Sequence, residues 1–125
     1  MIKTAKKILI VDDEDLITSL YQEFLNDYGF DSTICEDGVI ALETFEKTDI
    51  PFDLVITDQS MPNMTGTELS IALLNRVPNL PIILLTGASK IMLSESTKSI
   101  GIQHILQKPV SLFTLKEIID TCFNV

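Results

Sequence analysis

The sequence alternates short apolar runs, rich in β-branched residues, with longer stretches in which apolar residues recur at helical spacing. Strands are predicted at five of the short runs: Lys7 to Val11, Asp31 to Cys35, Asp53 to Thr57, Pro81 to Leu85 and His104 to Gln107. The first, third and fourth runs are almost continuously apolar, which is typical of strands covered on both faces. This alternation predicts an α/β fold with helices packed around a parallel sheet.

Helices are expected between these strands. Apolar residues spaced by four predict that the first helix buries one stripe and ends at Gly29; the stripe is Leu16, Leu20, Phe24 and Tyr28. A second helix is predicted from about Val39 to Lys47. A third should begin near Gly66, where Thr65 and Glu68 have the spacing of a capping box, and should close before Pro78.

Two further helices are predicted in the last third of the chain. The stretch Ser89 to Ser99 is the weaker, because its serines and threonines lower helix propensity. The last helix has Ser111 as its expected cap. Its apolar face comprises Leu112, Leu115, Ile118, Ile119 and Phe123.

Length and charge exclude several classes of protein. The 125 residues have the usual size of one domain, so a single domain over residues 1–125 without an output domain is expected. No apolar run is long enough to cross a bilayer, and only four apolar residues follow the N-terminal lysines before Asp12, so neither a membrane span nor a secretory signal is expected. We therefore expect a cytoplasmic protein. The net charge of −9 opposes direct binding to nucleic acid.

Polar residues follow the predicted strands at the positions where a parallel α/β sheet forms its ligand sites, beyond the carboxyl ends of the strands. Asp12 and Asp13 follow the first strand, and Asp58 follows the third. Thr86 follows the fourth strand and Lys108 the fifth. These five side chains are therefore expected to converge on one edge of the sheet.

The combination of three carboxylates with a lysine has a specific chemical logic. Carboxylates held together repel one another unless a cation neutralises them, and Mg²⁺ prefers oxygen ligands of this kind. A lysine beside such a site would attract a phosphoryl group. The set matches the requirements of phosphoryl transfer to a carboxylate, with Asp58 as the nucleophile and Asp12 and Asp13 better suited to holding the ion.

At these positions the chain resembles the receiver domains of two-component response regulators, and the resemblance covers nearly the whole sequence. Four motifs carry it, in order: Ile-Leu-Ile-Val-Asp12-Asp13-Glu14, Leu-Val-Ile-Thr-Asp58-Gln-Ser-Met61-Pro62-Asn-Met-Thr-Gly66, Leu-Leu-Thr86-Gly87 and Gln-Lys108-Pro109. The resemblance implies a flavodoxin-like doubly wound (βα)5 fold whose five-stranded parallel sheet has the order 2-1-3-4-5.

The resemblance also implies a role for each site residue. Asp58 would take a phosphoryl group from a phosphohistidine, and Mg²⁺ would be bound by Asp13, Asp58 and the Ser60 carbonyl, with Asp12 helping through water. Lys108 would contact a phosphoryl oxygen from a cis Lys108–Pro109 peptide. Thr86 would turn toward the phosphoryl group and change the surface of the fourth helix, fifth strand and fifth helix. Backbone amides of Ser60 and Gly87 would complete the set of groups around the phosphoryl group.

Partners follow from the same resemblance: a sensor histidine kinase or phosphotransfer protein upstream, and a protein target downstream. The only catalysis implied is self-catalysed phosphorylation and dephosphorylation. A dimer that depends on phosphorylation is compatible with the resemblance, and so are both a free-standing regulator and the receiver of a hybrid kinase. Ile105 stands where the family often has an aromatic switch residue, so its effect on switching is open.

Alternative interpretations exist for these motifs. Taken singly, the acid pair could be a helix-capping turn, and Asp58 or Thr86-Gly87 ordinary turn residues. A small phosphatase with Asp12 as nucleophile would need an aspartate at Glu14 and a longer chain. A flavodoxin would need a phosphate loop where acids stand after the first strand. A receiver-like module that binds proteins without phosphorylation is the third alternative, and Ile105 keeps it open.

Overall fold

The structure, a computed structural model, describes residues 5–87 and 97–123 and contains one parallel sheet of five strands. The strands are β1 (Lys7–Val11), β2 (Asp31–Cys35), β3 (Leu54–Asp58), β4 (Ile82–Thr86) and β5 (His104–Gln107). Their spatial order is β2-β1-β3-β4-β5. The predicted flavodoxin-like α/β fold is therefore confirmed.

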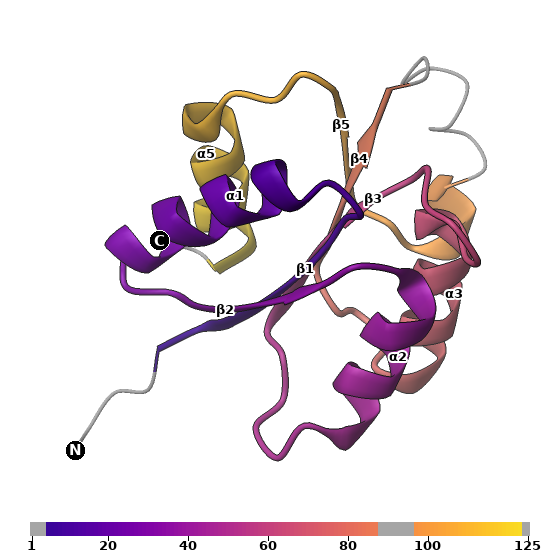
Figure 1. Cartoon of the computed structure of the whole chain (residues 1–125). Coiled ribbons are helices and arrows are strands. Elements are labelled where there is room, and N and C mark those ends of the chain that lie inside the picture. The colour runs from indigo at the N-terminus through magenta and orange to yellow at the C-terminus, as the bar shows by residue number, and fades with distance from the viewer. Residues whose placement is uncertain (1–4, 88–96, 124–125) are drawn as a thin grey trace.

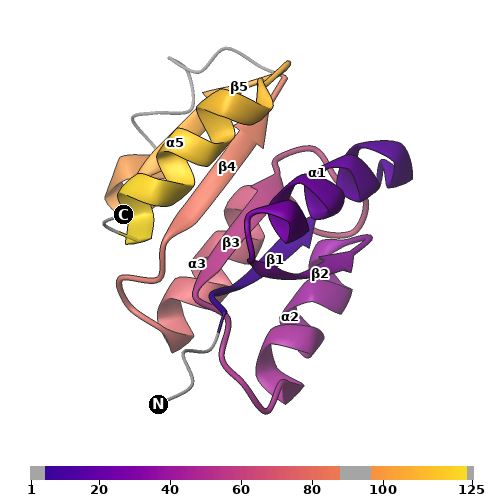
Figure 2. The same cartoon turned by 90° about the vertical axis from the view of Figure 1, so that its left-hand side faces the viewer.

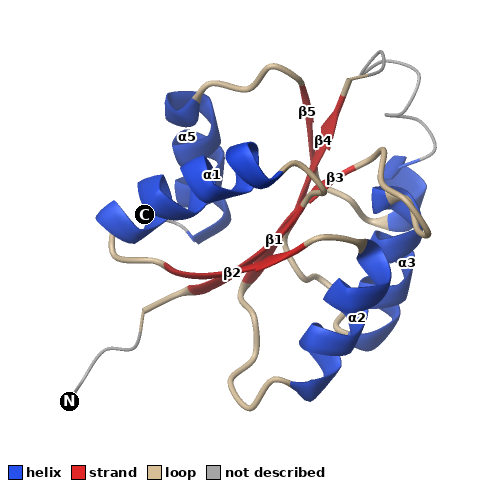
Figure 3. Cartoon of the chain, viewed as in Figure 1, coloured by secondary structure: helices blue, strands red, loops and turns tan. Residues whose placement is uncertain are grey.

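Helices cover both faces of this sheet (Figures 1 and 3). Helices α1 (Asp15–Asp27) and α5 (Leu112–Phe123) lie on one face, and α2 (Gly38–Lys47) and α3 (Gly66–Arg76) lie on the other. Figure 2 shows α5 running along β4 and β5, with α1 on the same face over β1 and β2. None of the helices in the described ranges is long and apolar enough to cross a membrane.

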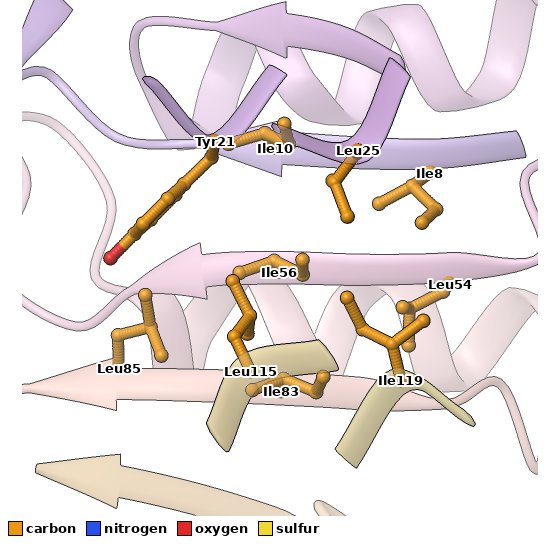
Figure 4. Close-up of a cluster of buried hydrophobic side chains, with 10 residues drawn as sticks. All are labelled: Ile8, Ile10, Tyr21, Leu25, Leu54, Ile56, Ile83, Leu85, Leu115 and Ile119. Atoms are coloured by element: carbon orange, nitrogen blue, oxygen red, sulfur yellow. The ribbon is translucent and has the colours of Figure 1, made fainter. Parts of the chain in front are cut away.

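Alternate residues of the central strands enter two separate cores, as expected for a sheet buried on both faces. Ile8 and Ile10 of β1 face α1 and α5, whereas Leu9 and Val11 face α2 and α3. Figure 4 shows the first core, which also contains Tyr21 of α1. The central strands are thus packed on both faces, and this packing positions the residues at their carboxyl ends.

The buried face of α1 differs from the prediction. Of the predicted stripe, Leu16 is 88% exposed, Leu20 50% and Tyr28 51%, and the buried residues are Thr18, Tyr21 and Leu25. Two neighbouring apolar stripes run along this helix. The buried stripe contains the polar Thr18, so it was not recognised as apolar from the sequence. The Thr18 hydroxyl can be buried because it donates to the carbonyls of Glu14 and Asp15, at 3.3 and 3.1 Å.

Two strands are displaced by one residue from the prediction. β3 and β4 end at Asp58 and Thr86, so these residues close their strands rather than follow them. Continued backbone pairing explains the shift, because Gln59 N donates to Leu85 O and Lys108 N to Thr86 O, both at 2.8 Å. The other three strands have the predicted bounds.

The predicted helix caps are confirmed. Gly29 has a φ of 84°, a conformation that favours glycine, and it follows Tyr28, the residue that caps the end of α1. Thr65 and Glu68 form a capping box at the start of α3, and Ser111 Oγ accepts from Thr114 N at 3.1 Å at the start of α5. Most of the predicted fourth helix, Ser89 to Ser99, lies outside the described residues; residues 97–100 are helical.

Candidate functional site

The polar residues selected from the sequence meet at the carboxyl edge of the sheet. β1 and β3 run in register, with Val11 opposite Thr57, so Asp12 and Asp58 leave neighbouring strands at the same level. On the other side, Asp58 pairs with Leu85 next to Thr86. Asp12 N donates to Cys35 O at 3.2 Å, which extends the sheet and fixes the backbone beneath the carboxylate.

Three carboxylates lie together at this edge. Asp12, Asp13 and Asp58 each offer an oxygen atom, and these atoms lie within 4.8 Å of one another. Asp12 and Asp58 are buried, at 2% and 5% exposed, whereas Asp13 is exposed. The triad therefore combines two desolvated carboxylates with one that faces solvent.

Lys108 supplies the positive charge next to the triad. Its Nζ lies 2.9 Å from Asp58 Oδ1 and 3.5 Å from Asp12 Oδ2. The Lys108–Pro109 peptide is cis, as predicted. Burial lowers the pKa of Lys108, but the hydrogen bond that the ammonium donates to Asp58 and the charges of Asp12 and Asp58 outweigh it, so the pKa is raised and the ammonium stays charged.

Burial makes the charged form of the Asp12 carboxyl unfavourable. Burial is the main cause that raises the pKa of its carboxyl, with the Asp58 charge adding to it; the Glu14 amide, which donates to Oδ1 at 3.1 Å, and Lys108 act in the opposite direction. The 3.5 Å contact of Oδ2 with Lys108 is an ion pair but is long for a hydrogen bond. Within the described residues, Asp12 Oδ2 is the buried side-chain oxygen that lacks a hydrogen-bond partner.

These observations fit a divalent cation. A buried carboxylate oxygen without a hydrogen bond is unfavourable, and one ammonium does not neutralise three carboxylates. Mg²⁺ takes oxygen ligands, commonly from one or two carboxylates, and keeps several waters that the exposed side of Asp13 can accommodate. Asp12, Asp13 and Asp58 are therefore suited to holding the ion.

The loop after β3 is anchored close to Asp58. Gly66 N donates to Gln59 O at 3.0 Å, and Gln59 Oε1 accepts from both the amide and the hydroxyl of Thr67 at 2.8 Å. A Cβ atom at Gly66 would lie 2.3 Å from the Asp58 carbonyl oxygen. Ser60 lies exposed in this loop. The Gln59 anchor was missed from the sequence, where a glutamine after the strand carried no distinguishing signal.

Thr86 and Gly87 lie at the same edge. The Thr86 side chain is buried at the end of β4, and Gly87 is exposed directly after it. All five predicted side chains thus come from the carboxyl ends of β1, β3, β4 and β5. Tyr21 is a buried residue of α1 whose hydroxyl points toward this edge in Figure 4. It was not predicted from the sequence, because it lies next to the solvent-facing apolar stripe of α1.

Replacing Asp12 with asparagine is expected to stabilise the metal-free protein while weakening Mg²⁺ binding at least tenfold. Asparagine keeps the oxygen that accepts from Glu14 N but carries no buried charge, so we expect a gain of roughly 0.5 to 2 kcal/mol in the free energy of unfolding. Urea denaturation with chelator, at pH 7.5, measures this gain.

The difference in stability between Asp12→Asn and the wild type should depend on pH. Because the pKa of Asp12 is raised in the folded state, the buried anion destabilises the wild type above that pKa, and protonation removes the penalty as the pH falls toward the ordinary value of 3.8. The advantage of Asp12→Asn should therefore shrink on acidification. A variant less stable than wild type at pH 7.5 in chelator would contradict the interpretation.

Comparisons with known proteins agree with this geometry. A family model for the response regulator receiver domain matches residues 8–120. The chemotaxis protein CheY-3 of Vibrio cholerae is 35% identical over 121 residues, covering 94% of this chain and 92% of that protein.

Solved structures give the same result. The Vibrio cholerae chemotaxis protein CheY4 superposes with a TM-score of 0.87 at 30% identity, covering 94% of this chain and 98% of that one. The response regulator protein TrrA of Thermotoga maritima, solved in complex with Mg²⁺-BeF, has a TM-score of 0.82 at 31% identity over 94% and 98% of the two chains.

Proposed function

Because the chain belongs to the family of response regulator receiver domains, we propose that it is a phospho-accepting switch in which Asp58 takes a phosphoryl group in a Mg²⁺-dependent reaction. Its acidic pocket is consistent with phospho-accepting signalling of the two-component type. CheY-like receiver domains are not classical enzymes, and the proposed reaction is one that the domain carries out on itself.

One observation carries the proposal: three carboxylates and one ammonium converge, and a buried oxygen of Asp12 among them lacks a hydrogen bond. Such a site is poorly satisfied by protein groups alone and is well suited to a cation plus a phosphoryl group. The Mg²⁺-BeF complex of the Thermotoga maritima relative supports the same metal and a phosphoryl-like group.

In the proposed reaction each of the site residues described above has its own role. An Asp58 carboxylate oxygen attacks the phosphorus of a phosphohistidine, the P–N bond breaks with its electron pair going to the ring nitrogen, and the imidazole leaves as a neutral ring that keeps the proton already on its other nitrogen. Bound Mg²⁺ would neutralise charge on the carboxylates and on the transferred group. The ammonium of Lys108, now 2.9 Å from Asp58 Oδ1, would move onto a phosphoryl oxygen, and the Thr86 hydroxyl would donate to another.

The biological setting is proposed from the family. A sensor histidine kinase or a phosphotransfer protein would supply the phosphoryl group in the cytoplasm, and a second protein would recognise the altered face around residues 97–100, β5 and α5. In this proposal the described fold acts as a single domain. The Ser60 carbonyl would take part in holding the ion, and the Ser60 and Gly87 amides would face the phosphoryl oxygens.

Intact-mass measurement tests the proposal. Wild type, Asp58→Asn and wild type with chelator are each incubated with acetyl phosphate and Mg²⁺. We expect a gain of one phosphoryl group in the wild type with free Mg²⁺ and none in the other two samples. If no sample gains mass and beryllofluoride with Mg²⁺ also fails to bind the wild type, the domain is a phosphorylation-independent interaction module instead.

A further inference from the structure

A groove next to the acidic pocket brings a phenol close to the site lysine. The groove has a volume of about 340 Å³ and lies between α1 and the segment that follows β5. Ile17, Leu20, Val110 and Leu112 form apolar walls, and Tyr21 and Lys108 both line it. The Lys108 ammonium thus lies in the acidic pocket, while the Lys108 side chain also lines this groove.

The Tyr21 hydroxyl has an unusual position for a core residue. Tyr21 is only 6% exposed, and its ring belongs to the core between the sheet, α1 and α5. In Figure 4 the ring extends so that its oxygen points toward the carboxyl ends of β3 and β4, the end at which the acids lie. No hydrogen bond joins this hydroxyl to another protein group in the described part of the chain. Because Asp12 Oδ2 is the buried side-chain oxygen that lacks a partner there, the Tyr21 hydroxyl is not enclosed but opens onto the groove that Tyr21 lines.

When a divalent cation binds the three carboxylates, the Lys108 ammonium loses hydrogen-bond acceptors and needs others. It has three hydrogen-bond donors and now contacts Asp58 and Asp12. A divalent cation on the triad would repel the ammonium and draw the Asp12 oxygen toward itself, which removes one of the two carboxylate contacts. An uncharged oxygen next to the lysine could accept the released donor without competing for the cation.

We propose that Tyr21 is a positioning residue for Lys108, whose hydroxyl oxygen accepts a hydrogen bond from the ammonium when a divalent cation engages Asp12. The inference rests on the proposed Mg²⁺-dependent function. In the metal-free state the lysine neutralises the acids, and in the metal-bound state Tyr21 holds it at the edge of the pocket, ready for a phosphoryl oxygen. Tyr21 would thereby favour metal binding without contacting the metal.

The electrostatics of the phenol agree with this placement. The pKa of Tyr21 is raised, chiefly by burial, while Lys108 lowers it and Asp12 and Asp58 raise it. The hydroxyl therefore lies within the electrostatic reach of the same lysine and carboxylates. A raised pKa also keeps the phenol neutral at physiological pH, so its lone pairs are available to an ammonium donor and it adds no charge to the site.

A double-mutant cycle on Mg²⁺ affinity tests the inference without any phosphoryl donor. The four proteins are wild type, Tyr21→Phe, Lys108→Met and the double variant, each titrated with Mg²⁺ while amide resonances are followed by two-dimensional NMR. We expect Tyr21→Phe to weaken Mg²⁺ binding about 3- to 10-fold, the effect of one lost hydrogen bond. In the Lys108→Met background the same change should have no effect, because no ammonium is left to hold.

Tyr28→Phe is the matched control. Tyr28 is 51% exposed beyond the end of α1, with its ring under Lys116 Nζ at 4.4 Å, so losing its hydroxyl should leave Mg²⁺ affinity unchanged. The same spectra report whether each variant is folded. An unchanged affinity in Tyr21→Phe, or an equal loss with and without Lys108, would overturn the inference. A wild type that binds no Mg²⁺ would instead refute the proposed function.

Discussion

The Gly66→Ala variant is expected to unfold at a markedly lower temperature than the wild type and to take up a phosphoryl group more slowly. The new Cβ would lie 2.3 Å from the Asp58 carbonyl oxygen and 2.7 Å from Leu84 Cδ1. The backbone of β3 cannot yield without loss of its pairing with β4, so the cost should be about 2 to 3 kcal/mol. For a domain of this size that is a fall in Tm of roughly 6 to 15 °C.

Gly87→Ala is the control for this prediction. Gly87 also lies at the edge of the site, but among the described residues other than its chain neighbours an added Cβ there would meet no atom within 4 Å. Differential scanning calorimetry should therefore show the large change only at Gly66. A Tm within 2 °C of wild type in Gly66→Ala would mean that the loop after β3 adapts easily, and Asp58 would then not be held by this close approach.

Lys108→Met is expected to separate metal binding from phosphoryl transfer. Removing the ammonium takes away the cation that now competes for Asp12 and Asp58, so Mg²⁺ should bind more tightly. The developing charge on the phosphoryl group then loses its positive partner, and the rate of uptake from acetyl phosphate should fall roughly 100- to 1,000-fold. Mass spectrometry over time measures the rate, and NMR titration measures the affinity.

Lys116→Met controls for the loss of a lysine as such. Lys116 pairs with Asp120 on α5, at 2.7 Å, so both the Mg²⁺ affinity and the uptake rate should match wild type. If Lys108→Met kept the wild-type uptake rate, the ammonium would serve only to neutralise the metal-free acids. A weaker affinity for Mg²⁺ in that variant would show that the lysine supports the metal rather than competing with it.

Much of the fold was predictable because local signals and global topology agree. Continuous apolar runs indicated strands buried on both faces, and the capping box at Thr65 and Glu68 placed the start of α3 correctly. The parallel arrangement then required residues at the ends of four strands to meet, which is why Asp12, Asp58 and Lys108 could be grouped before any contact was known. The strand order itself came from the family resemblance.

What the sequence could not reveal depends on packing in three dimensions. Periodicity alone did not decide which of two adjacent apolar stripes on α1 would face the sheet, and a polar residue, Thr18, lies on the buried one. The ends of β3 and β4 were set by pairing with neighbouring strands rather than by local residue type. The importance of Tyr21 and Gln59 depends on the residues that lie near them in three dimensions, and these cannot be identified from spacing in the sequence. The roles of Thr86 and Ser60 stay predictions.

The spread of the acidic pocket over four strand ends has a consequence for protein synthesis. Asp58 leaves the ribosome well before Lys108, and the edge of the sheet that carries the lysine is made last. Under the proposed function, a nascent chain therefore has the acceptor carboxylate before it has the ammonium that would neutralise charge on the phosphoryl group. Under the proposed function, rapid phosphoryl uptake should therefore appear only after β5 has docked, so rapid labelling would report that all five strands of the sheet are in place.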